Sequence, residues 1–162
     1  MKKRYPLVCL LLFLSLCYFP PLLSYADEKN GLSEGQTVYV PAYSHIYMGN
    51  REKPFLLTVT LSIRNIDPRH RITITTVDYY ETLGKRLEKK IEKPVILDPL
   101  ESKRYVIPES DSTGGSGANF IVTWESDRPV NPPVLESIMI GTQNQQGISF
   151  TSRGQVILPT KE

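Results

Sequence analysis

The residues whose types could do chemistry are concentrated in one glycine-rich stretch, residues 109–120. It combines two acids, several hydroxyls and an amide with three glycines in four positions. Glycine lets the backbone adopt positive φ and lets another group approach closely. A phosphate-binding loop would need Gly-x-x-x-x-Gly-Lys-Ser/Thr, or Gly-x-Gly-x-x-Gly opening a helix, and this stretch has neither. It is therefore either a plain connection between strands or a loop that contacts a ligand or partner.

One hypothesis for this stretch is a small hydrolase. Ser116 would be the nucleophile, with His45 or His70 as its base. Asp111 or Asp78 would orient that base. Serine, histidine and aspartate are common, and no spacing ties these five together, so the pattern favours a non-enzymatic role.

A calcium-stabilised structural domain is a second alternative. Glu109, Asp111 and loop carbonyls, with Asn119, would supply the oxygen ligands that calcium prefers. Zinc is poorly supported, since the chain after residue 26 has two histidines and no cysteine. We predict no cofactor.

The interpretation that we favour is a binding or protein-interaction module. A segment rich in tyrosine and histidine, residues 42–48, would join the glycine-rich loop at one end of the fold. The partner of this module would be an unknown protein or small molecule. The predicted contact residues are Tyr43, His45, Tyr47, Glu109, Ser110, Asp111, Ser116 and Asn119.

We expect the loop over 110–119 to be ordered. Five short polar side chains could bond to nearby backbone amides there: Asp111, Ser112, Thr113, Ser116 and Asn119. The glycines at 114, 115 and 117 are then expected at positive φ.

The N-terminal residues have the organisation of a signal peptide. A basic start, Lys2 to Arg4, precedes an apolar run over 7–19, and Ser24-Tyr25-Ala26 predicts cleavage after Ala26. Cys17 allows a lipoprotein alternative, although Leu16 is bulky before it, and a retained membrane anchor is a third possibility. Each version places the rest of the chain outside the membrane, in the periplasm or extracellular space.

Charge excludes a nucleic-acid partner. The whole chain has 19 Lys and Arg against 17 Asp and Glu, but three of the basic residues lie within 1–26. The remaining 16 against 17 leave no basic excess for a polyanion. Contact with the membrane would come only from the signal segment or an anchor.

The rest of the chain predicts strands. Phe55, Leu57, Val59, Leu61 and Ile63 face one way and the polar residues Thr58, Thr60, Ser62 and Arg64 the other, as in a strand with one buried face. Further strands are predicted at 36–40, 71–80, 95–97, 104–107, 120–124, 134–140, 147–150 and 156–158. The segment 42–48 is either an edge strand or an ordered loop, 85–93 an exposed edge strand, and 127–133 a proline-rich connector.

The strand pattern also predicts one irregularity and part of the core. In 71–80, the apolar residues change parity, and a β-bulge near Thr75-Thr76 would return them to one face. Alternation also predicts a core that contains Val59, Leu61, Phe120, Val122 and Trp124.

Many short strands broken by proline, glycine and aspartate predict an all-β fold, a single antiparallel β-sandwich of immunoglobulin-like or similar type. The predicted organisation is a signal peptide at 1–26, a short polar linker at 27–35 and the sandwich at 36–162.

Five stretches carry a family resemblance: residues 38–47, 61–65, 77–80, 109–120 (apart from 112–113) and 145–150. Together they resemble the uncharacterised bacterial exported family known as domain of unknown function 3124, over nearly all of the chain after Gly35. The resemblance implies export and one compact domain. It implies no activity, and no residue role is carried over.

Overall fold

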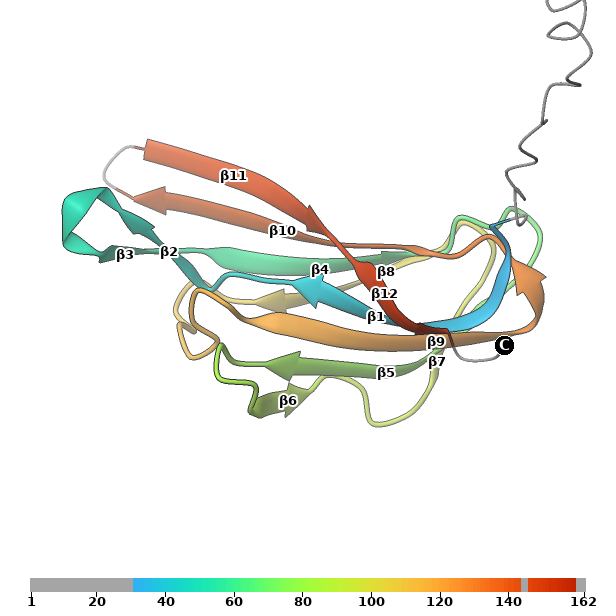
Figure 1. The fold of residues 1–162 in the computed structure, drawn as a ribbon. Helices are drawn as coiled ribbons and strands as arrows, with labels where there is room; N and C mark the ends of the chain where they lie inside the picture. The colour runs from blue at the N-terminus through green and yellow to red at the C-terminus, as the bar shows by residue number, and fades with distance from the viewer. Residues whose placement is uncertain (1–30, 144–145, 160–162) are drawn as a thin grey trace, which may run out of the picture. The chain divides into compact units, whose positions relative to one another are not determined.

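A computed structural model of the chain describes residues 31–143 and 146–159. The predicted signal peptide and the hairpin tip at 144–145 lie outside the described residues. The described chain folds into two packed antiparallel sheets, which confirms the predicted all-β sandwich (Figure 1). No helix in these ranges has the length and apolar character needed to cross a bilayer.

The larger sheet contains six of the described strands. Their order is β12 (Gln155–Pro159), β1 (Ser33–Pro41), β9 (Asn119–Val130), β5 (Ile72–Tyr80) and β6 (Arg86–Lys89), with β7 (Val95–Leu97) also paired to β5. The smaller sheet has the order β11 (Gln146–Arg153), β10 (Val134–Gln143), β4 (Thr58–Arg64) and β8 (Ser102–Ile107). A separate hairpin joins β2 (His45–Met48) to β3 (Lys53–Leu56) through the 3₁₀ turn η1 (Gly49–Arg51).

The core lies between the two sheets and confirms the predicted residues. Phe120, Val122 and Trp124 of β9 and Val59 and Leu61 of β4 are all fully buried. Alternation therefore assigns the buried face correctly in both sheets.

The predicted bulge is also confirmed. The register between β5 and β9 shifts between Ile74 and Thr76, where Ile74 pairs with Trp124 and Thr76 with Thr123. The extra residue, Thr75, restores the parity. As a result, the side chains of Ile72, Ile74, Val77 and Tyr79 are all buried.

Several predicted boundaries are corrected. The single strand over 55–64 is divided between β3 and β4 at Leu57, whose N–H donates to the Ser44 carbonyl at 2.9 Å. The strand predicted at 120–124 continues as β9 to Val130, so residues 127–130 are strand and not connector. Within 42–48, a short loop leads into β2 at His45. Of the edge strand predicted at 85–93, only Arg86–Lys89 forms a strand, β6, which lies at the edge of the larger sheet.

Gly154 lets the chain pass from the smaller sheet to the larger one, between β11 and β12. Its N–H donates to the Leu135 carbonyl at 2.8 Å. A Cβ there would lie 2.7 Å from Val38 Cγ1, so the two sheets approach closely at this point. β12, predicted at 156–158, then pairs with β1.

Candidate functional site

The two segments predicted to form a binding site meet at one end of the sandwich. β1 pairs with β9 up to Pro41 and Asn119. Beyond that pair, the Ala42 N–H donates to the Ala118 carbonyl at 2.8 Å. The Ser44 N–H and hydroxyl both donate to the Gly115 carbonyl, at 3.0 and 3.1 Å. We call residues 42–48 together with 109–119 the loop end.

The loop over 109–119 is also held by its own polar groups. Asp111 Oδ1 accepts the Thr113 N–H at 3.0 Å and the Thr113 hydroxyl. The Gly115 N–H donates to the Ser112 carbonyl at 3.2 Å. This agrees with the predicted turn chemistry for Asp111 and Thr113. Among the described residues, the side chains of Ser112, Ser116 and Asn119 form no hydrogen bond, so their predicted anchoring roles are wrong.

Two of the three loop glycines are required for a different reason than predicted. Only Gly115 has positive φ, at 79°. A Cβ on Gly114 would lie 1.9 Å from the Tyr79 hydroxyl oxygen, so this glycine is needed for close packing. A Cβ on Gly117 would be 3.1 Å from Thr82 Cγ2, a tight but less severe contact.

Thr82, which follows β5, is an anchor that the sequence did not reveal. Its N–H and hydroxyl both donate to the Gly114 carbonyl, at 2.9 and 3.0 Å. Its hydroxyl oxygen accepts the Gly117 N–H at 3.0 Å. The loop is therefore tied on one side to Ser44 and on the other to Thr82.

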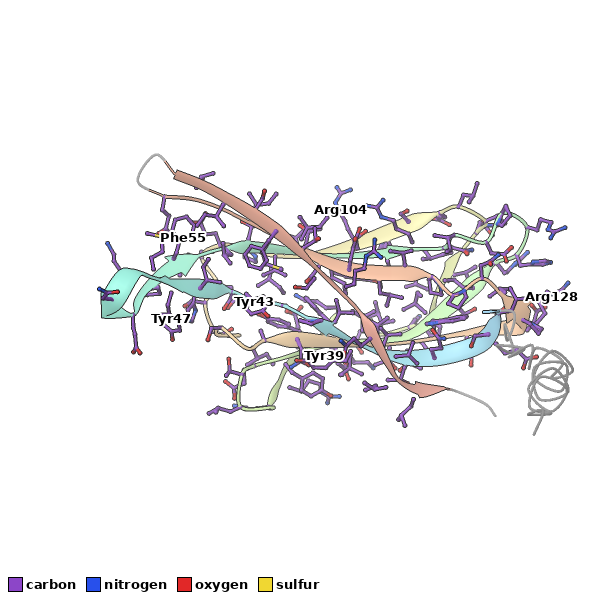
Figure 2. All side chains as sticks on the ribbon, turned by 45° about the horizontal axis from the view of Figure 1, so that its top comes forward. Tyr39, Tyr43, Tyr47, Phe55, Arg104 and Arg128 are labelled. Carbon is purple, nitrogen blue, oxygen red and sulfur yellow. The ribbon has the colours of Figure 1, made fainter. Side chains whose placement is uncertain are left out.

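Aromatic side chains cover the other half of the loop end. The ring of Tyr43 packs edge-on against Phe150, with centroids 5.7 Å apart. The rings of His45 and Tyr47 are 5.3 Å apart at 82°, and Tyr47 is 55% exposed. Figure 2 shows Tyr47 at the tip of this end.

The acidic residues of the loop end have protein partners. Glu109 Oε1 accepts the Gln143 side-chain N–H at 3.1 Å, which ties the loop to β10. Ser110 is exposed next to it. Glu109 and Asp111 thus engage different partners, and the described chain contains no group of three His, Cys, Asp or Glu side chains that could hold a metal. The geometry gives no support to the calcium alternative.

The hydrogen bond that a hydrolase would need is not formed in the described chain. His45 Nε2 lies 3.4 Å from the Tyr47 hydroxyl. His70 Nδ1 lies 3.1 Å from Asp67 Oδ1, in the loop before β5. Asp78 is paired with Arg86 at 3.2 Å. Neither histidine is hydrogen-bonded to Ser116 within the described residues, so the hydrogen-bonded arrangement of nucleophile and base is not formed.

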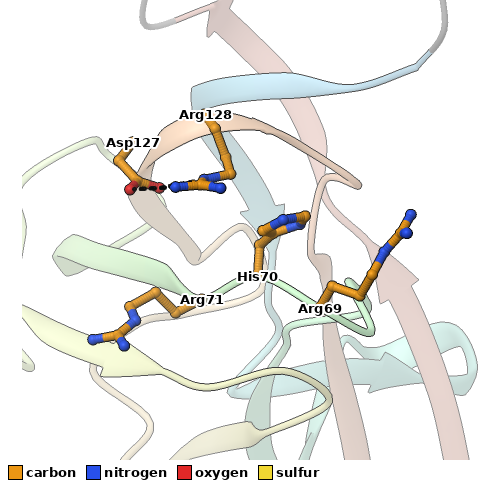
Figure 3. A pocket seen from close by; sticks show the side chains of 5 residues that line it. All are labelled: Arg69, His70, Arg71, Asp127 and Arg128. Atoms are coloured by element: carbon orange, nitrogen blue, oxygen red, sulfur yellow. Dashed lines mark hydrogen bonds and ion pairs between the residues drawn. The ribbon is translucent and has the colours of Figure 1, made fainter.

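The opposite end contains a basic cleft that the sequence did not suggest. It has a volume of about 400 Å³ and lies between the loop before β5 and the last part of β9. Figure 3 shows its lining: Arg69, His70, Arg71, Asp127 and Arg128. We call it the arginine cleft. Asp127 is the one acid among the lining residues, and the Arg128 guanidinium holds its pKa below the ordinary value.

A buried carboxylate, Asp67, organises the loop that carries half of this cleft. Its Oδ1 accepts the N–H groups of Arg69 and His70, both at 2.9 Å. Its Oδ2 accepts the N–H and the side-chain amide of Asn131, both at 3.1 Å. These donors hold the pKa of Asp67 far below its ordinary value, with the Arg69 N–H as the largest cause.

Residues 35–157 match the family described as Protein of unknown function (DUF3124). The chain belongs to this family. No curated protein matches the chain. A solved structure titled "Crystal Structure of Thermotoga maritima 1070" is similar, with 15% identity, a TM-score of 0.42, and coverage of 74% of this chain and 92% of the other. That likeness carries no functional argument.

Membership in DUF3124 confirms the resemblance found in the sequence, and it leaves the function to be argued from the sites. Sequence reasoning found both halves of the loop end, because unusual composition marks each of them. It missed Thr82 and the arginine cleft, because each depends on which distant segments become neighbours.

Proposed function

We propose that this DUF3124 protein is an exported, non-enzymatic binding module of the cell envelope, and that the loop end is its contact surface. The observation that carries the proposal is the pair of Ser44 hydrogen bonds to Gly115. They join two segments far apart in the sequence into one surface. Loops held on a rigid sheet are common sites of recognition.

The side chains of the loop end suit a protein partner better than a small molecule. Tyrosine offers a large contact area with few rotatable bonds, and hydroxyls add adaptable hydrogen bonds. Tyr47 projects from the tip at 55% exposure, with Ser112 and Thr113 exposed on the loop. A small-molecule site would more typically be an enclosed apolar cavity.

A photo-crosslinking amino acid placed at Tyr47, in cells, tests the contact surface. We expect a discrete crosslinked product from Tyr47 and from Ser112. The matched control is Ile96 of β7, which is similarly exposed at 53% but lies on the larger sheet. The proposal is wrong if Tyr47 gives no product, or if Ile96 gives the same one.

Export is a separate part of the proposal, and it rests on the sequence of residues 1–26. Removal of this segment would leave Asp27 as the first residue. The intact mass of the protein recovered from the envelope decides between the alternatives. A retained Met1, or a lipid attached to Cys17, would contradict cleavage after Ala26.

A further inference from the structure

We infer that the arginine cleft is a second binding site, specific for a phosphate group carried by a small molecule or by a lipid headgroup. It goes beyond the proposed function, because it lies at the end of the sandwich opposite the loop end. Figure 2 shows this separation, with Tyr47 and Arg128 at the two ends.

The first argument is charge. Arg69 and Arg71 are exposed and form no ion pair within the described chain. With Arg128 they place three guanidinium groups against one carboxylate, Asp127. The arginines therefore outnumber the carboxylate that lines the cleft, and the net positive charge favours an anionic ligand such as a phosphate group. Guanidinium groups bind phosphate through pairs of parallel N–H donors, and they do so in preference to single-point contacts.

The second argument is that Asp127 already holds the Arg128 side chain in place. Arg128 Nε and Nη2 donate to the two oxygens of Asp127, at 3.2 and 3.3 Å. A guanidinium has five N–H donors, so this bidentate pair leaves others available. The pair also fixes the direction of the Arg128 side chain, which would otherwise lose rotamer freedom on binding a ligand.

The third argument is rigidity beneath the cleft. Asn65, 1% exposed, donates from Nδ2 to the carbonyls of His70, Leu97 and Asp98, at 2.9, 3.2 and 3.0 Å. Asp67, 4% exposed, binds the N–H groups of Arg69 and His70 from the other side. The backbone that carries the arginines is therefore preorganised, which lowers the cost of binding.

His70 completes one wall of the cleft. Its Nδ1–H donates a hydrogen bond to Asp67 Oδ1, a carboxylate oxygen that can only accept. Its other nitrogen, Nε2, has no hydrogen bond to the described chain. In Figure 3 the ring lies between Arg69 and Arg71. An anion seated there would meet basic side chains on both sides of the ring.

The volume indicates the size of the ligand. The cleft is open to solvent, and its volume of about 400 Å³ exceeds what a lone phosphate ion fills. The ligand would therefore be a phosphate attached to a small organic group. The cleft is lined by charged side chains, so that group is expected to be polar, such as a glycerol.

Calorimetric titration of the full chain at constant ionic strength tests the site, with glycerol 3-phosphate as one probe and short-chain phosphatidylglycerol as the other. Saturable binding of glycerol 3-phosphate supports a soluble ligand, and tighter binding of the lipid supports a headgroup. Saturable binding of neither probe at millimolar concentration overturns the inference.

The double variant Arg69→Gln/Arg71→Gln is expected to weaken binding by at least about tenfold, which corresponds to the loss of two charge-assisted contacts. Both side chains are exposed, so its melting temperature should remain near that of the unmodified protein. The matched control is Arg104→Gln, because Arg104 lines a different cleft on the smaller sheet. An equal loss in the Arg104 variant would mean diffuse attraction to positive charge and would overturn the site.

Discussion

Gly114→Ala is the substitution that tests most directly how the loop end is built. The added Cβ would lie 1.9 Å from the Tyr79 hydroxyl oxygen, 2.7 Å from Tyr79 Cζ and 2.9 Å from Ala118 Cβ. Tyr79 is 1% exposed, and its ring packs on Phe120 with centroids 4.9 Å apart. The ring has no free space to retreat into, so the loop or the core must shift.

The magnitude follows from this geometry. Overpacking a close-packed interior costs typically about 1–3 kcal/mol, and a rigid buried ring places this case at the upper end, about 3 kcal/mol. Gly115→Ala combines two effects, since its φ of 79° disfavours a Cβ and the added atom would lie 2.4 Å from Thr82 Oγ1, and we expect about 1–2 kcal/mol. Gly117→Ala should cost less, because the nearest atom is a side-chain methyl at 3.1 Å.

Chemical denaturation of each variant measures these costs. Gly147→Ala is the matched control, because a Cβ there meets nothing within 4 Å. A second comparison uses Tyr79→Phe as the background, which removes the atom at 1.9 Å and leaves the ring carbon at 2.7 Å. Gly114→Ala should then cost less than in the parent. If it costs no more than Gly147→Ala, or the same in both backgrounds, the packing argument is refuted.

Three further predictions concern the stability of the fold. Trp124→Ala should cost about 3–5 kcal/mol in urea denaturation, since the side chain is fully buried, and an unchanged midpoint would contradict this. Burial raises the pKa of Tyr79 to about 12 from its ordinary 10.0, so the unfolded chain loses this proton first and stability should fall between these pH values. Tyr79→Phe should reduce this loss of stability at alkaline pH. Tyr105→Phe should reduce it less, although burial raises the pKa of Tyr105 as well. The pKa of Asp67 is lowered, so its stabilisation is present above about pH 4 and is lost as pH falls below that value. Asp67→Asn should be less stable at neutral pH and lose less stability on acidification, and a parallel acid profile would refute the assignment.

Much of the fold could be predicted because burial in a strand has a period of two. From Phe55 to Ile63 and from Phe120 to Trp124 every second residue is apolar, and each predicted core residue is buried. The bulge in β5 could be placed because its parity change is visible in the sequence. The length of β9 could not, because Asp127-Arg128-Pro129 is typical of a turn, and its strand geometry depends on its neighbours.

The sequence predicted those features of the sites that depend on residues close together in the chain. Asp111 bonds to Thr113, two residues away, and that pattern is a recognisable turn. Gly114 was predicted to need unusual φ, whereas its requirement comes from Tyr79, which belongs to another strand. A short polar residue shows its local partners in the sequence, but a contact across strands depends on register.

Asp67 shows why the arginine cleft could not be found in this way. Within the sequence it stands before Pro68 and has the composition of a turn residue. In the fold its second oxygen accepts two hydrogen bonds from Asn131, which follows the end of β9. Because β5 and β9 are neighbours in the larger sheet, the loop before β5 and the end of β9 lie together. Sheet pairing thus brings Arg69 and Arg71 to the same cleft as Arg128, and Asp67 is the residue that links the two halves.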